Sequence, residues 1–146
     1  KTVFFFFFEL AAELDMPVNI HDRAAHRYTL EMLKKYKPKG IVHCFSGSVE
    51  MAKEIVKLGM YIGIGGVVTF KNARKTVEVI EAIPLERLVL ETDCPYLSPV
   101  PFRGKRNDSS MIKYTAQRIA EIRNTTEEEI LTKTRRNAAD DYKINM

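Results

Sequence analysis

Short apolar runs alternate along this chain with segments in which apolar residues recur at helical spacing. Four of the runs are predicted to be strands, over residues 17–22, 40–45, 60–66 and 88–92. A helical pattern follows each of them, and turn-forming residues such as Gly59 end the helices. Because strands that alternate with helices pair in parallel through crossover connections, the pattern predicts an α/β fold of parallel (β/α) units.

The helical segments differ in regularity. The N-terminal one contains five consecutive phenylalanines at residues 4–8, which cannot all lie on one helix face, so some rings must be exposed or contact a partner. The helix after the first strand is expected over residues 23–36. After the fourth strand a proline-containing loop over 94–108 leads to two closing helices, which Ser110 and Thr126 are expected to cap.

The fourth predicted strand ends in two carboxylates. Side chains alternate along a strand, so Glu91 and Asp93 share one face. One interpretation is that Asp93 only initiates the turn before Pro95, as aspartate often does. However, His21 and His43 stand at the corresponding ends of the first and second strands. Since the carboxyl ends of parallel strands lie at one edge of a sheet, we expect His21, His43 and Asp93 to converge.

Two neutral imidazoles and a carboxylate form a donor set that suits zinc and would also accept magnesium or manganese. We interpret His21, His43 and Asp93 as candidate metal ligands, and Asp93 also as a candidate catalytic group. A single histidine at a strand end is more often a structural residue, and only the shared placement of the three favours a metal site. As a two-metal site this set is incomplete.

Composition and charge place only weak constraints on the number of domains, the partners and the location of the protein. The 146 residues suit a single domain over 1–146 with a hydrophobic core. Lys and Arg outnumber Asp and Glu by 23 to 19, a formal charge of +4 that is compatible with an anionic partner without requiring one. The apolar block at 3–8 is far shorter than the roughly 20 residues that cross a bilayer, so no signal peptide or membrane partner is expected. Cys44 and Cys94 form no disulfide framework, which favours reduced thiols and a cytoplasmic location.

Basic residues stand near the predicted site. Arg23 follows the first strand, where it could hold a substrate phosphate or pair with a carboxylate. Arg103, Lys105 and Arg106 cluster in the loop after the fourth strand, which suits a phosphate backbone, although such clusters are usually plain solvated loops. These four residues are the candidate substrate-binding residues.

Five motifs, in this order and spacing, resemble the TatD family of metal-dependent deoxyribonucleases: Val18-Asn-Ile-His-Asp-Arg23, Ile41-Val-His-Cys-Phe-Ser-Gly-Ser48, Gly63-Ile-Gly-Gly-Val-Val-Thr-Phe70, Leu90-Glu-Thr-Asp-Cys-Pro-Tyr-Leu97 and Pro101-Phe-Arg-Gly-Lys-Arg-Asn107. The resemblance implies a (β/α)8 TIM barrel that hydrolyses DNA phosphodiester bonds with one or two divalent metal ions. It also implies that His21 and His43 bind one metal, and that Asp93 serves the other and positions or deprotonates the attacking water.

Two parts of the family's pattern have no counterpart in this sequence: the His-x-His pair of its first strand and the bridging glutamate of its fourth. We therefore expect the chain to be the C-terminal half of a TIM barrel, lacking the N-terminal strands, since a whole barrel needs about 250 residues. Little activity is expected from such a chain alone. The alternative is a catalytically inactive half-barrel fragment or engineered scaffold that folds or dimerises. Because four strands cannot close a barrel, unpaired strand edges favour a homodimer.

Overall fold

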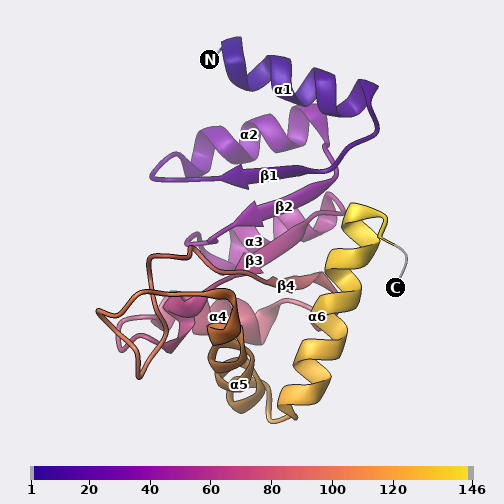
Figure 1. Cartoon of the computed structure of the whole chain (residues 1–146). Coiled ribbons are helices and arrows are strands. Elements are labelled where there is room, and N and C mark those ends of the chain that lie inside the picture. Colours follow the sequence, from indigo (N-terminus) through magenta and orange to yellow (C-terminus); the bar gives the residue numbers. More distant parts are fainter. Residues whose placement is uncertain (1, 145–146) are drawn as a thin grey trace.

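The computed structural model of the chain describes residues 2–144, and the side chains of residues 5–144 (Figure 1). Within that range four strands alternate with helices: β1 (Val18–His21), α2 (His26–Tyr36), β2 (Gly40–His43), α3 (Val49–Lys57), β3 (Tyr61–Ile64), α4 (Arg74–Ala82) and β4 (Leu88–Leu90). Helix α1 (Thr2–Glu13) precedes them, and α5 (Ile112–Arg123) and α6 (Glu127–Tyr142) follow. Short 3-10 helices cover Gly66–Thr69, Leu85–Arg87 and Ser109–Met111.

The strands form one parallel sheet in the order β1-β2-β3-β4. The predicted α/β fold with a parallel sheet is thus confirmed. Each strand lies beside its predecessor in the chain, which is the winding of a (β/α) barrel, whereas a doubly wound sheet reverses its strand order part-way. All four carboxyl ends consequently point the same way, to the left in Figure 1, where the loop between β4 and α5 also lies.

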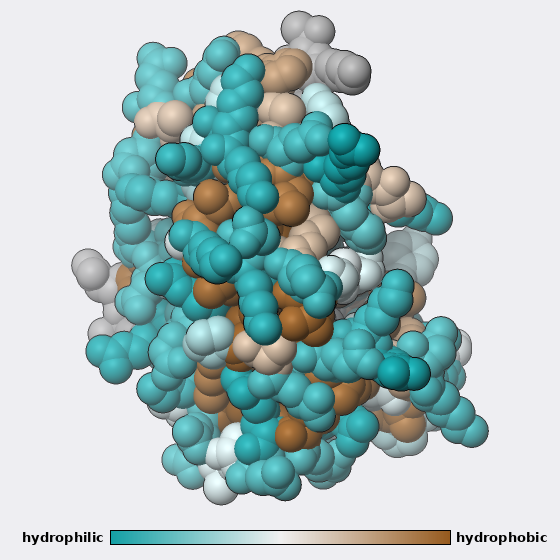
Figure 2. All heavy atoms as spheres, turned by 180° about the vertical axis from the view of Figure 1, so that it is seen from behind, coloured by the Kyte–Doolittle hydropathy of each residue, from teal (hydrophilic) through white to brown (hydrophobic). Residues whose placement is uncertain are grey.

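The two faces of the sheet differ in character. Alternate strand residues pack with the helices into the hydrophobic core, among them Ile20, Val42, Ile62 and Leu88. Because side chains alternate along a strand, the intervening residues, His21 and His43 included, belong to the opposite face. Seen from behind, the molecule has a largely hydrophilic surface, and apolar residues lie between the polar side chains in a central band (Figure 2). The core side of the sheet is therefore closed by helices, and the candidate residues lie on the other side.

Helix α1 divides its phenylalanines between core and solvent. Phe8 is buried and its ring stacks on Tyr36 with centroids 5.4 Å apart, and Phe5 contacts the same tyrosine. Phe6 and Phe7 are 60% and 59% exposed. The expectation that the helix cannot bury all of these rings is confirmed for the residues with described side chains.

Two helix starts differ from the sequence-based expectation. Helix α2 begins at His26 and not at Arg23, because the buried Asp22 accepts hydrogen bonds from the Ala25 amide (3.0 Å) and from the side chain of His26 (2.7 Å), which makes residues 23–25 a turn. Ser110 does not cap α5. The Asp108 carboxylate accepts the Ser110 amide at 2.8 Å and begins a 3-10 turn before α5.

The cap predicted for α6 is confirmed, because the Thr126 hydroxyl accepts the Glu129 amide at 3.2 Å. Ser48 caps α3 in the same way, accepting the Met51 amide at 3.3 Å. Both hydroxyls satisfy amides that have no partner inside the first helical turn. The loop that follows His43 therefore ends at a defined position, where α3 begins.

Helix α6 runs beside β4 and covers part of its outer edge (Figure 1). The buried Asn137 donates its side-chain amide to the carbonyls of Leu88 (2.7 Å) and Leu85 (2.8 Å). At the end of the same helix the Lys143 ammonium pairs with Asp15, which also binds Lys39 at 2.5 Å. The expectation of a fully unpaired last strand is wrong at Leu88, because an amide side chain takes the place of a neighbouring strand.

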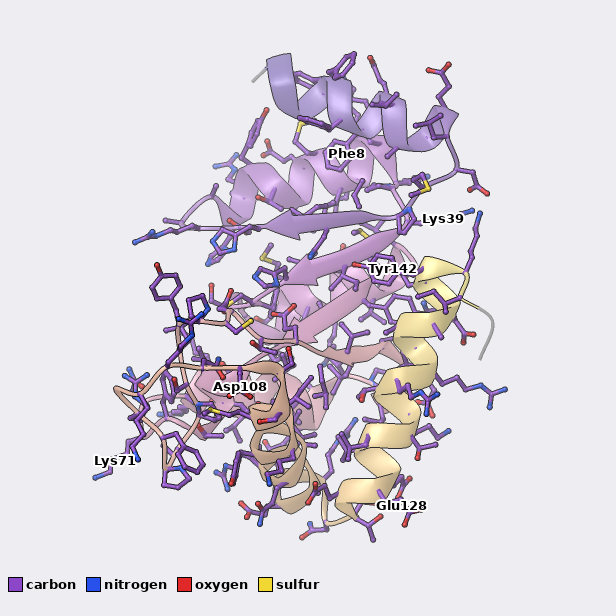
Figure 3. The ribbon with its side chains drawn as sticks, viewed as in Figure 1. Phe8, Lys39, Lys71, Asp108, Glu128 and Tyr142 are labelled. Carbon is purple, nitrogen blue, oxygen red and sulfur yellow. The ribbon has the colours of Figure 1, made fainter. Side chains whose placement is uncertain are left out.

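None of the helices in the described part of the chain combines the length and the apolar character that crossing a bilayer requires. Cys44 and Cys94 are both free thiols, as the sequence indicated. Tyr142 extends from the last turn of α6 toward the sheet at its amino end, opposite the loop that contains Asp108 (Figure 3).

Candidate functional site

The structure brings His21, His43 and Asp93 to one end of the sheet. His21 and His43 are directly opposite each other in the register of β1 and β2, and their ring centroids are 5.5 Å apart. Asp93 lies three residues beyond β4 and reaches back, so that its Oδ1 is 2.9 Å from His43 Nε2. The shared position at strand ends, which the sequence pattern predicted, is what makes these contacts possible.

Glu91 holds the other side of the His43 ring. Its Oε2 is 2.6 Å from His43 Nδ1, and its second oxygen accepts the backbone amide of Cys44. The carboxylate lies over Gly63, where any added Cβ would clash with it. A residue without a side chain in β3 therefore creates the space in which a partly buried glutamate can orient the histidine.

The two carboxylates change the acid-base properties of the site. Burial alone would lower the pKa of His43, but Glu91 and Asp93 together raise it above its ordinary value. Burial raises the pKa of the Glu91 carboxyl, and contacts with His43 and the Cys44 amide oppose that rise. The two carboxylates therefore favour the protonated form of His43.

The hydrogen-bonding pattern of His43 limits what Nε2 can do. An ionised carboxylate only accepts hydrogen bonds, so Nδ1 carries the proton in the contact with Glu91. In the neutral imidazole Nε2 then presents its lone pair toward the Asp93 carboxylate, which is also an acceptor. A proton or a cation is needed to make that contact favourable, and a histidine held on its far nitrogen by a carboxylate is a common metal-ligand arrangement.

The donor types fit a divalent cation, but their number falls short of a closed shell. His43 Nε2 and Asp93 Oδ1 lie together, whereas His21 is exposed on the neighbouring strand. Among residues 2–144 no three His, Cys, Asp or Glu side chains gather closely enough to hold a metal. Zinc sites in proteins use three or four protein ligands. An ion bound here would take its remaining ligands from a reoriented His21, from solvent or from another chain.

Cys44 contributes a neutral group to the site. Burial, followed by the charge of Asp93 and a hydrogen bond to it, raises the pKa of the Cys44 thiol to about 12. The thiol therefore stays protonated near neutral pH and can donate to Asp93.

The basic cluster lies on a loop that is anchored at several points. The Thr69 hydroxyl accepts the Val100 amide at 2.9 Å, and Gly66 leaves no room for a side chain beside the Leu97 carbonyl. The Arg103 guanidinium lies 3.7 Å from the centroid of the Phe70 ring, a stacking contact that fixes its position. Arg103, Lys105 and Arg106 are all exposed, so they can meet an anion without first breaking a buried contact.

Arg23 is exposed in the turn between β1 and α2, next to the buried Asp22. That carboxylate is engaged with the Ala25 amide and His26. The functional residue that sequence reasoning left out of the site is Glu91. Its signal was present, because Glu91 and Asp93 alternate onto one face of the strand that the sequence predicted over residues 88–92 and its continuation.

Comparison with known proteins gives a consistent result. A family model described as TatD related DNase matches residues 1–143. The uncharacterized metal-dependent hydrolase YabD of Bacillus subtilis (strain 168) is 48% identical over 139 residues, which cover 93% of this chain and 54% of that protein. The uncharacterized metal-dependent hydrolase YcfH of Escherichia coli (strain K12) is 39% identical over 134 residues, which cover 90% of this chain and 51% of that protein.

Solved structures share the fold. YJJV, a TatD homolog from Escherichia coli K12, is 33% identical and superimposes with a TM-score of 0.87, covering 94% of this chain and 54% of that one. A hydrolase TatD family protein from Entamoeba histolytica superimposes with a TM-score of 0.80 at 24% identity, which shows a common fold. The chain thus spans about half the length of the relatives that it matches.

Proposed function

Because this chain belongs to the family of TatD related DNases, we propose that it provides His21, His43 and Asp93 to a metal-dependent hydrolase that cleaves phosphodiester bonds in DNA. The observation that carries the proposal is the pairing of His43 with Asp93 at 2.9 Å, while Glu91 fixes the opposite ring nitrogen. Relatives named metal-dependent hydrolases support the general reaction class. The basic loop and the net positive charge support an anionic polymer as substrate.

Each side chain has a role that follows from its contacts. Glu91 keeps His43 in the tautomer that directs the Nε2 lone pair outward. Asp93 offers a carboxylate oxygen beside that nitrogen, where it can accept a proton from an attacking water. Arg103, Lys105 and Arg106 hold the phosphates on either side of the bond to be cleaved. His21 and His43, with Asp93, would bind zinc, magnesium or manganese, and the ion would supply the Lewis acidity that activates water and offsets phosphate charge.

One or two ions are compatible with this assignment, and zinc is favoured by the two imidazoles. Because fewer than three donors converge within the described residues, added metal is expected to be needed for any activity. If added metal produces no cleavage, the competing proposal of an inactive half-barrel is favoured.

A nuclease assay on the full chain tests the proposal. Any cleavage of a fluorescently labelled oligonucleotide should require added zinc, magnesium or manganese and should stop after chelation. Asp93→Asn should abolish cleavage, because an amide cannot accept the proton and is a weaker ligand. Asp108→Asn is the matched control, since Asp108 lies on the same loop but caps a helical turn. Cleavage that survives both chelation and Asp93→Asn would refute the proposed mechanism.

A further inference from the structure

Tyr96 presents its ring to solvent beside the candidate site. It follows Asp93 by three residues and is 74% exposed, although it is a large aromatic. The Tyr96 amide donates to the Asp93 carbonyl at 2.8 Å, which closes a four-residue turn. Such a turn keeps the first and last Cα atoms within about 7 Å. The backbone of Tyr96 is therefore held close to that of Asp93 in space.

The backbone of Tyr96 is held on its other side as well. Asn107, which is 4% exposed, donates its side-chain amide to the Tyr96 carbonyl at 2.7 Å and its backbone amide to the Pro95 carbonyl at 3.0 Å. A buried amide thus ties the end of the basic loop to the turn that carries Asp93. The exposed ring stands on a segment with a defined position, and it is not part of a loose loop.

The other aromatic rings of this region are used inside the protein. Phe70 stacks on Arg103, and Phe102 packs against Tyr114 with centroids 5.0 Å apart. Tyr96 differs, because most of its surface remains in water and contributes little to folding. Leu97, which follows it, is also exposed. An anchored aromatic ring that is left in solvent next to a reactive centre is suited to binding a ligand.

The residues around Tyr96 indicate which chemical class of ligand its ring is suited to bind. The cluster of Arg103, Lys105 and Arg106 lies on the same loop and is exposed. A ligand that meets both features has a flat apolar part for the ring and negative charge for the cations. Nucleotides combine these properties, since every base has a π-face and every linkage carries a phosphate, and aromatic stacking tolerates any base.

We propose that Tyr96 is a stacking platform for the nucleobase next to the phosphate held at His43 and Asp93. The proposal rests on the proposed function, because it assumes a nucleic acid phosphodiester at that site. It assigns to Tyr96 the binding of a base, whereas the basic loop binds phosphates irrespective of the bases. The ring would thereby fix which linkage of the polymer faces Asp93.

Fluorescence gives a direct test, because the chain contains no tryptophan and Tyr96→Trp introduces a single reporter. The probes are a thymidine tetranucleotide and an abasic tetramer with the same phosphates, both measured with chelator so that no cleavage occurs. The tetranucleotide should quench the emission, and the abasic tetramer should leave it unchanged. Tyr61→Trp is the matched control, because Tyr61 is the first residue of β3 and therefore lies at the amino end of the sheet, away from the candidate site.

Affinity measurements complete the test. In fluorescence anisotropy, Tyr96→Ala should bind the labelled tetranucleotide at least about tenfold more weakly than the wild type does. Its affinity for the abasic tetramer should be unchanged. Tyr96→Phe should bind like the wild type, because stacking needs the ring and not the hydroxyl. Equal quenching by the two probes, or equal quenching of the Tyr61→Trp reporter, would overturn the proposal. If the two probes are discriminated but cleavage survives both chelation and Asp93→Asn, the proposed function fails and the stacking site stands. Cleavage without such discrimination supports the proposed function and refutes the stacking site.

Discussion

His43 and Glu91 are 48 residues apart in the chain, and their side chains meet with Nδ1 2.6 Å from Oε2. The contact joins the second strand to the end of the fourth across β3, and it is possible because Gly63 leaves space between them. Glu91 therefore sets both the orientation and the proton affinity of the histidine that faces Asp93.

Glu91→Gln should lower the pKa of His43. A neutral amide no longer stabilises the imidazolium, whereas burial, which lowers the pKa, is unchanged. The His43 ring resonances, followed by NMR across a pH titration, report the value. Glu50→Gln is the control, since Glu50 is an exposed carboxylate on α3. An unchanged His43 pKa in Glu91→Gln would show that Asp93 alone accounts for the raised value.

The raised pKa of His43 also predicts a pH dependence of stability. Protonation of His43 is favoured more strongly in the folded chain than in the unfolded chain, where the pKa is about 6.5. The resulting stabilisation is complete below that value and is lost as the pH rises through the higher folded pKa. Urea unfolding at a series of pH values should reveal this loss, and His43→Gln should abolish it.

Gly63→Ala should destabilise the chain by about 1–3 kcal/mol, because the new methyl group would overlap the Glu91 carboxylate and force it away from His43. Gly65→Ala is a close control, since its Cβ would lie 3.7 Å from the nearest atom, an ordinary contact. Urea unfolding of both variants measures the difference. Equal stability of the two would mean that Glu91 can move without cost.

Zinc should bind weakly to the isolated chain. His43 and Asp93 lie together, but no third donor joins them within residues 2–144, so water would complete the coordination shell. Calorimetric titration should show loose binding that His43→Ala weakens further, while His26→Ala, in the neighbouring turn, has little effect. Tight binding of two ions per chain would contradict the geometry described above.

Asn137→Ala should lower the free energy of unfolding, because the Leu88 carbonyl at the edge of β4 and the Leu85 carbonyl in the preceding 3-10 helix lose their hydrogen-bond donor. The expected cost is about 1–3 kcal/mol for each buried group left unpaired. Asn72→Ala, at an exposed position before α4, should be nearly neutral. If the two variants unfold at the same urea concentration, water must replace the Asn137 amide without cost.

Self-association remains a prediction. Within the described residues β1 pairs only with β2, so its outer edge is free. A groove of about 370 Å³ between α1 and β1 is lined mostly by apolar residues, Phe7 and Leu14 among them, and ends at His21. Free edges and exposed apolar surface favour association. Sedimentation equilibrium should show species heavier than the 16.8 kDa monomer, and Phe7→Ser should shift the equilibrium toward monomer. A monodisperse monomer at micromolar concentrations would exclude the homodimer.

The local pattern of apolar and polar residues was sufficient to predict the strands and helices. It also predicted the end of the sheet at which the candidate residues lie. Alternation of apolar strands with helices predicted the parallel sheet, and the position of His21, His43 and Asp93 after three strands predicted a common edge. The motifs that resemble TatD nucleases indicated the family that the comparisons confirmed. These features depend on periodicity and on neighbours in the chain, which a sequence displays directly.

Only the tertiary structure decided which partners each side chain has. The sequence placed Glu91 on the same face as Asp93, but its contact with His43 depends on the registers of β2, β3 and β4 together and on the missing side chain at Gly63. The start of α2 at His26 depends on the Asp22 carboxylate, and the 3-10 turn before α5 depends on the Asp108 carboxylate. In both cases the conformation of the folded loop determines which groups the carboxylate binds. The same holds for Tyr96, whose exposure results from a turn that the buried Asn107 fixes from eleven residues away. Such contacts are set by three-dimensional proximity, for which residue type and spacing carry no direct signal.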